Sequence, residues 1–163
     1  MIPALLLLFA LFEPASAPAP KSVTAQGMTV TWQQVDGGWA ITMTAPTQGW
    51  VAIGFNESEQ LTGTYLIMGA VENGQAKVVE HRTLAPGDYR PITELGGRVS
   101  VSQVQGSENA TGTQLGFWIP EQAADRLHKQ LKPGSKWHLL LAYSAEDDFA
   151  HHSRMRTSIL IEL

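Results

Sequence analysis

The sequence contains no cysteine among its 163 residues, and this absence excludes several kinds of site. Without thiols the chain can form no disulfide, no cysteine-ligated zinc site and no iron–sulfur cluster. It also has no C-x-x-C-H sequence for covalent attachment of haem. Any metal or haem must therefore be held by histidine, methionine or carboxylate side chains, and the hydrophobic core alone must hold the fold.

Charged residues are also scarce, at 16% of the chain, and they give a formal net charge of -4. A mildly acidic chain without lysine or arginine clusters has no electrostatic attraction for phosphate, so we expect no nucleic acid partner. The chain also lacks a G-x-S-x-G nucleophile elbow, a phosphate-binding loop and a dinucleotide fingerprint. We therefore expect a domain that binds a ligand rather than an enzyme with its own active site.

The longest apolar run lies at the N-terminus, from Ala4 to Phe12. It is too short for a permanent span of the bilayer, and an A-x-A pattern follows it at Ala15 to Ala17. This combination predicts a signal peptide, and we assign residues 1–20 to the signal peptide and a short Pro/Ala lead. Residues 21–163 are then one exported domain, periplasmic or extracellular, with no stable membrane span.

The rest of the sequence alternates short apolar segments with turn signals, which is typical of an antiparallel β-sandwich. Asn73-Gly74 and residues 35–38 have the composition of hairpin turns. Residues 121–131 carry apolar side chains at helical spacing, and we expect them to form the one short helix. The expected strands are 28–33, 39–44, 49–55, 64–72, 76–81, 99–104, 113–119, 136–144 and 155–163.

The predicted strand over residues 49–55 has two unlike faces. One face carries Val51, Ile53 and Phe55, an ordinary core pattern, whereas the other is nearly bare beyond Trp50. Small residues on a strand let a bulky group approach the backbone. That group is either a large side chain of another strand or a flat ligand, and the sequence leaves both open.

Two segments resemble the DOMON domain family. Its central signature is similar to residues 49–81, GWVAIGFNESEQLTGTYLIMGAVENGQAKVVEH, and its C-terminal strand pair is similar to residues 139–163, LLLAYSAEDDFAHHSRMRTSILIEL. The resemblance extends from about Val30 to Leu163. It implies an immunoglobulin-like antiparallel β-sandwich that binds haem or sugars. Some members of the family are extracytoplasmic cytochromes with a b-type haem held by one methionine and one histidine.

Residue by residue, the resemblance implies a haem site with one altered ligand. The family's haem methionine falls at Leu61, which cannot ligate iron, and its histidine falls at His151 or His152. Met68, on the following strand, and Met155, near the two histidines, are the candidate replacement ligands. Trp50 can stack on a porphyrin or a sugar ring.

The choice between the two histidines depends on strand alternation. Adjacent residues of a strand point to opposite faces. Extended backwards from Met155, whose face is apolar, this alternation places His151 inward and His152 outward. We therefore name His151 as the candidate iron ligand, since a neutral imidazole binds haem iron well.

Three functions follow, and the sequence does not decide among them. The first is a non-covalent haem b site in an electron-transfer module that serves a redox partner protein. The second is a carbohydrate- or small-molecule-binding module without metal. The third is a structural or partner-binding domain that has lost the haem methionine, for which Leu61 is the main evidence. Two further interpretations of the segment Asp147 to His152 are a divalent metal site and a solvated loop in which imidazoles pair with carboxylates.

Overall fold

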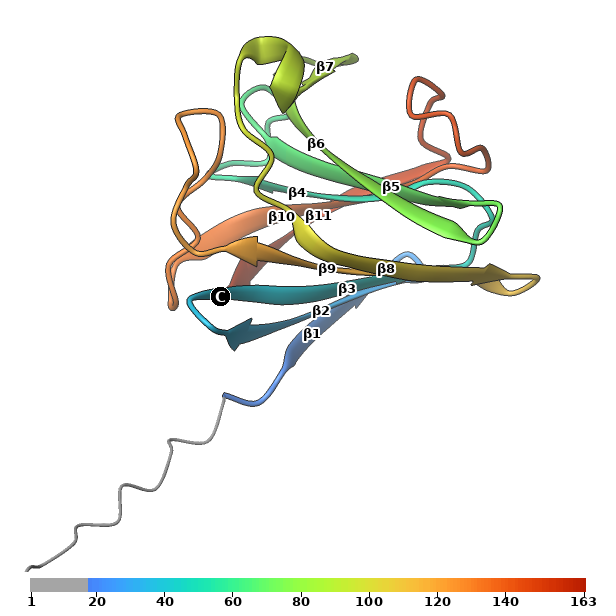
Figure 1. Ribbon diagram of the computed structural model, residues 1–163, viewed down its shortest axis with the longest axis horizontal. Coiled ribbons are helices and arrows are strands. Elements are labelled where there is room, and N and C mark those ends of the chain that lie inside the picture. The colour runs from blue at the N-terminus through green and yellow to red at the C-terminus, as the bar shows by residue number, and fades with distance from the viewer. Residues whose placement is uncertain (1–17) are drawn as a thin grey trace, which may run out of the picture.

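The structure is a computed structural model that describes residues 18–163, so all but the last residues of the predicted signal peptide and lead lie outside the described residues. Two antiparallel sheets pack face to face (Figure 1), which confirms the immunoglobulin-like sandwich. The first sheet has the strand order β1 (Lys21–Ala25), β2 (Met28–Val35), β3 (Gly38–Ala45), β9 (Gly112–Pro120) and β8 (Ser102–Asn109). The second has the order β11 (Met155–Glu162), β10 (Lys136–Tyr143), β4 (Val51–Asn56), β5 (Tyr65–Glu72), β6 (Gln75–Ala85) and β7 (Asp88–Pro91).

The core between the sheets is built from the alternate residues that face inward. Eight large inward side chains are buried there: Trp32, Trp39, Val51, Ile53, Phe55, Leu139, Leu141 and Ile161. Ile159 is only partly buried. It lies on β11, an edge strand of the second sheet, where the opposite sheet covers side chains incompletely.

The second sheet is unusual because β4 and β5 are buried on both faces. Their outward residues form a separate apolar cluster with Ala142 of β10: Trp50, Ala52, Leu66, Met68 and Ala70. A sandwich strand with one solvated face would carry polar residues there, so this face must be covered. The cover is the loop of residues 144–154 between β10 and β11, which stands over the outer side of the sheet (Figure 1).

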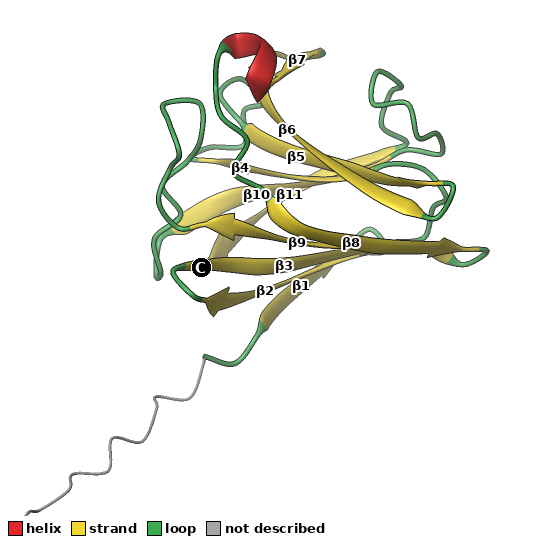
Figure 2. Cartoon of the chain, in the orientation of Figure 1, coloured by secondary structure: helices red, strands yellow, loops and turns green. Residues whose placement is uncertain are grey.

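The expected helix over residues 121–131 is wrong, because this segment is an irregular loop. The Asp125 carboxylate accepts the backbone N–H of Leu127 and of Arg98, at 2.9 and 2.8 Å, and such side-chain bonds compete with helical ones. The Trp39 indole donates to the carbonyl of Leu131 at 2.7 Å. Within residues 18–163 the one helical element is the 3-10 turn η1 (Ile92–Leu95), drawn red in Figure 2.

Two edge strands, β1 and β7, were not expected from the sequence. Each pairs with a single neighbour, β1 with β2 and β7 with β6. The stretch 106–112, expected as a polar connection, mostly extends β8 and β9 into one hairpin. No helix in the described part of the chain is long and apolar enough to cross a membrane.

Candidate ligand pocket on the second sheet

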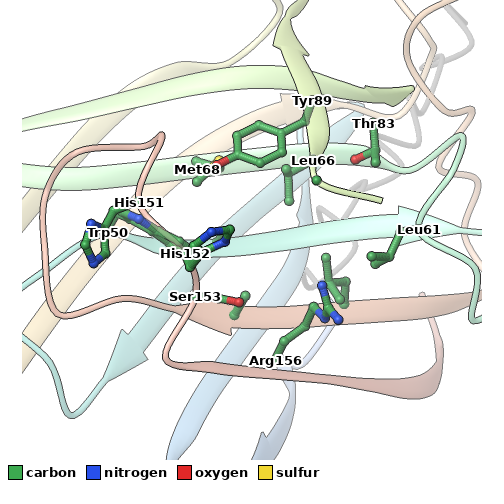
Figure 3. Close-up of a pocket in the computed structure, with 14 residues that line it drawn as sticks. Trp50, Leu61, Leu66, Met68, Thr83, Tyr89, His151, His152, Ser153 and Arg156 are labelled. Carbon is green, nitrogen blue, oxygen red and sulfur yellow. The ribbon is translucent and has the colours of Figure 1, made fainter. Parts of the chain in front are cut away.

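A pocket lies on the outer face of the second sheet, beside the loop 144–154 (Figure 3). Its floor is recessed because small residues stand next to one another in the register. Ala142 of β10 pairs with Ala52 of β4, which pairs with Met68 of β5. In the next row Gly54 separates Leu140 from Leu66. The nearly bare face of β4 is therefore not filled by another strand.

The loop 144–154 is fixed at its base by backbone hydrogen bonds. The N–H of Ser144 donates to the carbonyl of Trp50 at 2.9 Å, and the N–H of Trp50 donates to Glu146 at 3.0 Å. This close approach requires glycine at position 49, since a Cβ on Gly49 would lie 2.4 Å from the backbone nitrogen of Glu146. The first glycine of the GWVAIGF segment thus positions the loop that borders the pocket.

The tip of the loop is held by Phe149. Its ring packs on the outer apolar cluster, edge-on to His81 at 6.0 Å between ring centroids, with the Lys77 ammonium 5.4 Å from the ring. The Tyr89 hydroxyl donates to the carbonyl of Phe149. With the loop in this position the cavity measures about 100 Å³, whereas drug-sized ligands occupy about 300–1,000 Å³. A ligand as large as a porphyrin therefore requires the loop to move outward.

All four predicted site residues line this pocket. Trp50 and Met68 are buried in its floor, with 3% and 1% of their surface exposed. His151 and His152 are exposed and lie together on the Trp50 side (Figure 3). Both precede β11, so strand alternation does not extend to them, and the expected separation of an inward His151 from an outward His152 does not hold.

Leu61 lines the opposite side of the pocket from the imidazoles (Figure 3). The loop that carries it follows β4, and the Asn56 side chain fixes this loop by donating to the carbonyls of Gln60 and Thr62, at 2.5 and 3.1 Å. The two segments that the family resemblance implies thus border one pocket. Leu61 offers no donor atom, and the Met68 thioether is the only sulfur in the lining.

Sequence reasoning missed four polar residues of the pocket: Thr83, Tyr89, Ser153 and Arg156. Tyr89 comes from the unexpected strand β7. Arg156 lies on β11 opposite Ala142 and therefore points to the same outer face as Ala52 and Met68. The register between β10 and β11 would have revealed Arg156, but the sequence alone does not fix that register.

The Trp50 indole N–H is buried, and no acceptor in residues 18–163 reaches it. Three other indoles donate hydrogen bonds: Trp39, Trp118 and Trp137. The Trp32 indole also lacks an acceptor within this range, but it faces a different region, near Pro18 and Leu163. A buried donor without a partner costs free energy, so an acceptor in the pocket would relieve this cost at Trp50.

The loop's carboxylates do not assemble a metal site. Within the described residues no group of three or more histidine, aspartate or glutamate side chains converges. Asp148 shapes the turn instead, since its carboxylate accepts the N–H of Ala150 at 2.9 Å and its carbonyl accepts that of His151 at 2.9 Å. In the same part of the chain neither His151 nor His152 forms an ion pair with a carboxylate.

A second group of titratable side chains is buried away from the pocket, where the loop 121–131 meets the sandwich. Glu80 accepts hydrogen bonds from the hydroxyls of Tyr65 and Ser100, and its carboxylate lies 3.3 Å from Nε2 of His128. Nδ1 of His128 lies 2.9 Å from Asp125. Burial alone would raise the pKa of Glu80, but the hydrogen bonds from His128, Ser100 and Tyr65 lower it to about 2.

The same network shifts the pKa of the imidazole in the other direction. Burial alone would lower the pKa of His128, but the carboxylates of Glu80 and Asp125 raise it. Burial and the Glu80 charge together raise the pKa of Tyr65 well above its ordinary value. These groups form a charged pair that fastens the loop 121–131 to β6, and none of them lines the pocket.

An immunoglobulin-like sandwich with a recessed, loop-covered pocket on one sheet defines the class of this protein. The chain belongs to the DOMON domain family, whose match covers residues 24–144. It is similar to MOXD1 homolog 2 of Drosophila melanogaster, with 27% identity over 118 residues. That match covers 72% of this chain but 15% of the relative, so the chain corresponds to a small part of that protein.

The fold is similar to that of the cytochrome b domain of pyranose dehydrogenase from Coprinopsis cinerea, with a TM-score of 0.62. The match covers 83% of this chain and 76% of that chain. Since only 10% of residues are identical, the likeness shows the shared sandwich and not a shared site.

Proposed function

We propose that this DOMON domain binds b-type haem non-covalently in the pocket of the second sheet and serves as an exported electron-transfer module for a redox partner protein. One observation carries the proposal. Two imidazoles from the loop 144–154 and one thioether from β5 border the same apolar recess, although His151 and Met68 are far apart in the sequence. Imidazole and thioether are among the side chains that hold haem iron in proteins.

The lining fits a haem in its chemistry. The floor of aliphatic side chains and Trp50 would exclude water from the porphyrin faces, and Trp50 offers a ring for stacking. His151 is our first candidate for the iron, and His152 is its alternative because both line the pocket. Met68, or the second imidazole, is the candidate on the other side of the iron. Bound haem would supply a one-electron Fe(III)/Fe(II) couple.

Reconstitution with haemin followed by visible spectroscopy tests the proposal. We expect a sharp Soret band in the wild type that one of the two substitutions, His151→Ala or His152→Ala, removes and the other retains, because both imidazoles line the pocket. Met68→Leu should keep the band but shift its position if the thioether binds iron. His138→Ala is the matched control, because His138 lies on the same sheet outside the pocket lining. Absence of a Soret band in folded wild-type protein would overturn the haem proposal.

Export is part of the same proposal, and it rests on the N-terminal apolar run and the A-x-A pattern. We expect the mature protein to begin between about Ser16 and Lys21. N-terminal sequencing of the secreted or periplasmic product checks this expectation. A cytoplasmic product that retains Met1 would contradict it.

A metal-free carbohydrate or small-molecule site is the second candidate function. Leu61 favours it, because the position that matches the family's haem methionine has no donor atom. The closed cavity of about 100 Å³ also favours a ligand smaller than haem. Titration of sugars against Trp50 fluorescence, with Trp50→Phe as control, distinguishes this function. If neither haem nor sugars bind, the structural or partner-binding role is left.

A further inference from the structure

The lining of the pocket contains basic side chains and no acidic ones. Among the 14 residues of the lining are one arginine and two histidines, and no aspartate or glutamate. The whole chain is acidic, with a net charge of -4. A recess whose lining holds an arginine and no carboxylate favours an anionic ligand over a neutral one.

Arg156 is the one lining residue that is charged at every physiological pH, and its side chain is not engaged by other residues of the described chain. Two of the other basic side chains form ion pairs: Lys129 pairs with Glu57 at 2.9 Å, and Arg90 pairs with Asp88 at 3.4 Å. Arg156 forms no ion pair or hydrogen bond within residues 18–163. Its guanidinium lies at the rim beside Ser153, where a planar fork of donors suits a carboxylate (Figure 3).

The buried indole of Trp50 gives a second, independent indication. Its N–H has no acceptor within residues 18–163, and the residue is 97% buried in the pocket floor. The pocket lining thus contains one residue with an unpartnered buried donor, Trp50, and a cation, Arg156, around aliphatic side chains.

We infer that the ligand of this pocket is an acid, with a flat apolar body over the recess and an anionic group paired with Arg156. The inference rests on one part of the proposed function, that this pocket binds a ligand, and it does not require the ligand to be haem. If that ligand is haem, the anionic group is a propionate. Arg156 is then a specificity-determining residue that selects acids over their neutral analogues.

Two pairs of probes test the inference. The first pair is haemin and its dimethyl ester, which lacks the carboxylate charges. The second pair is 8-anilinonaphthalene-1-sulfonate and the uncharged N-phenyl-1-naphthylamine, which share one aromatic body. Dissociation constants are measured from Soret absorbance for the first pair and from probe fluorescence for the second.

Wild-type protein should bind the anionic member of a pair more tightly by about three- to tenfold, the range for a partly exposed charge-assisted pair. Arg156→Gln should lower the affinity for the anionic member to that of the neutral one and leave the neutral one unchanged. Arg156→Lys should keep most of the preference. Arg154→Gln is the matched control, since Arg154 precedes the same strand but lies outside the pocket lining.

The outcomes separate this inference from the haem proposal. If the naphthalene pair shows the Arg156-dependent preference and haemin gives no Soret band, the acid inference stands and the haem proposal fails. If haemin and its ester bind equally and Arg156→Gln changes neither, the haem proposal stands and the inference is overturned. Failure of wild-type protein to bind any of the four probes overturns both.

Discussion

Replacement of Glu80 by glutamine should destabilise the protein through the buried network that holds the loop 121–131. The Glu80 side chain is 1% exposed, and that of His128 is 2% exposed. Besides the Tyr65 and Ser100 hydroxyls, the backbone N–H groups of Ser100 and Val101 donate to the Glu80 carboxylate at 2.7 and 3.2 Å. Glutamine keeps the shape of the side chain but removes its charge.

The size of the effect follows from the pKa of Glu80. Folding lowers this pKa from 4.5 to about 2, and each pKa unit corresponds to about 1.4 kcal/mol. The ionised carboxylate therefore stabilises the folded state by about 3 kcal/mol at neutral pH. We expect Glu80→Gln to lower the free energy of unfolding by about 2–4 kcal/mol, since removal of one partner of a buried pair costs about 3–5 kcal/mol and glutamine retains some of the hydrogen bonds.

The contributions of Glu80 and His128 to the free energy of unfolding depend on pH in opposite directions. The pKa of Glu80 is lowered on folding, so its contribution is complete above about pH 4.5 and is lost as the pH falls toward about 2. The pKa of His128 is raised on folding, so its contribution is complete below its unfolded pKa of 6.5 and is lost as the pH rises through the folded value. Wild type and variant should therefore differ most between about pH 4.5 and 6.5.

Urea unfolding at a series of pH values between 2 and 8 measures this difference. Glu57→Gln is the matched control, because Glu57 is 72% exposed where it pairs with Lys129, and an exposed pair contributes about 1 kcal/mol at most. A difference below 1 kcal/mol at pH 5.5, or one that stays constant between pH 2 and 6, would refute the reasoning.

Three further predictions concern the pocket and its loop. Trp50→Phe removes the buried N–H that has no acceptor in the described residues, so the ligand-free protein should unfold at an equal or higher temperature while ligand affinity falls; lower stability with unchanged affinity would contradict this. Phe149→Ala releases the tip of the loop, and stopped-flow mixing with haemin should show faster association than in the wild type, whereas the exposed substitution Glu146→Ala should leave the rate unchanged. Gly49→Ala places a Cβ 2.4 Å from the Glu146 backbone nitrogen, and the resulting displacement should lower the free energy of unfolding by about 1–3 kcal/mol; an unchanged denaturation midpoint would show that the loop does not depend on this contact.

The sequence predicts most of the nine longer strands because their alternation is set by burial against the opposite sheet, whereas β8 is an exposed edge strand that begins at Ser102 rather than at the expected residue 99. It fails at β1 and β7, which lie at sheet edges and have one pairing partner each. It also fails at residues 121–131, whose apolar spacing suits a helix. There Asp125 and His128 bond to groups outside the segment, Arg98 and Glu80, and contacts so distant in sequence override local helix propensity.

The site was predictable in its floor but not in its rim. Trp50 and Met68 belong to strands that are apolar on both faces, a pattern that already indicates a covered outer surface. What covers that surface is a loop about ninety residues further along the chain, and no local pattern reveals this pairing. Arg156 was missed for the same reason, since its position depends on the register between β10 and β11.

The loop 144–154 carries both the candidate iron ligands and Phe149, the residue that holds the tip of the loop against the sheet. Phe149 at its tip packs on the outer cluster, and His151 and His152 follow within three residues. A movement that admits a large ligand therefore also moves the imidazoles, so binding and loop position are coupled. If the open state is populated at about 1%, the observed affinity is about one-hundredth of the intrinsic affinity. Phe149→Ala should favour the open loop and keep both imidazoles, so it should bind the ligand more tightly. Removal of the whole loop also opens the pocket, but it removes the imidazoles and should therefore weaken binding.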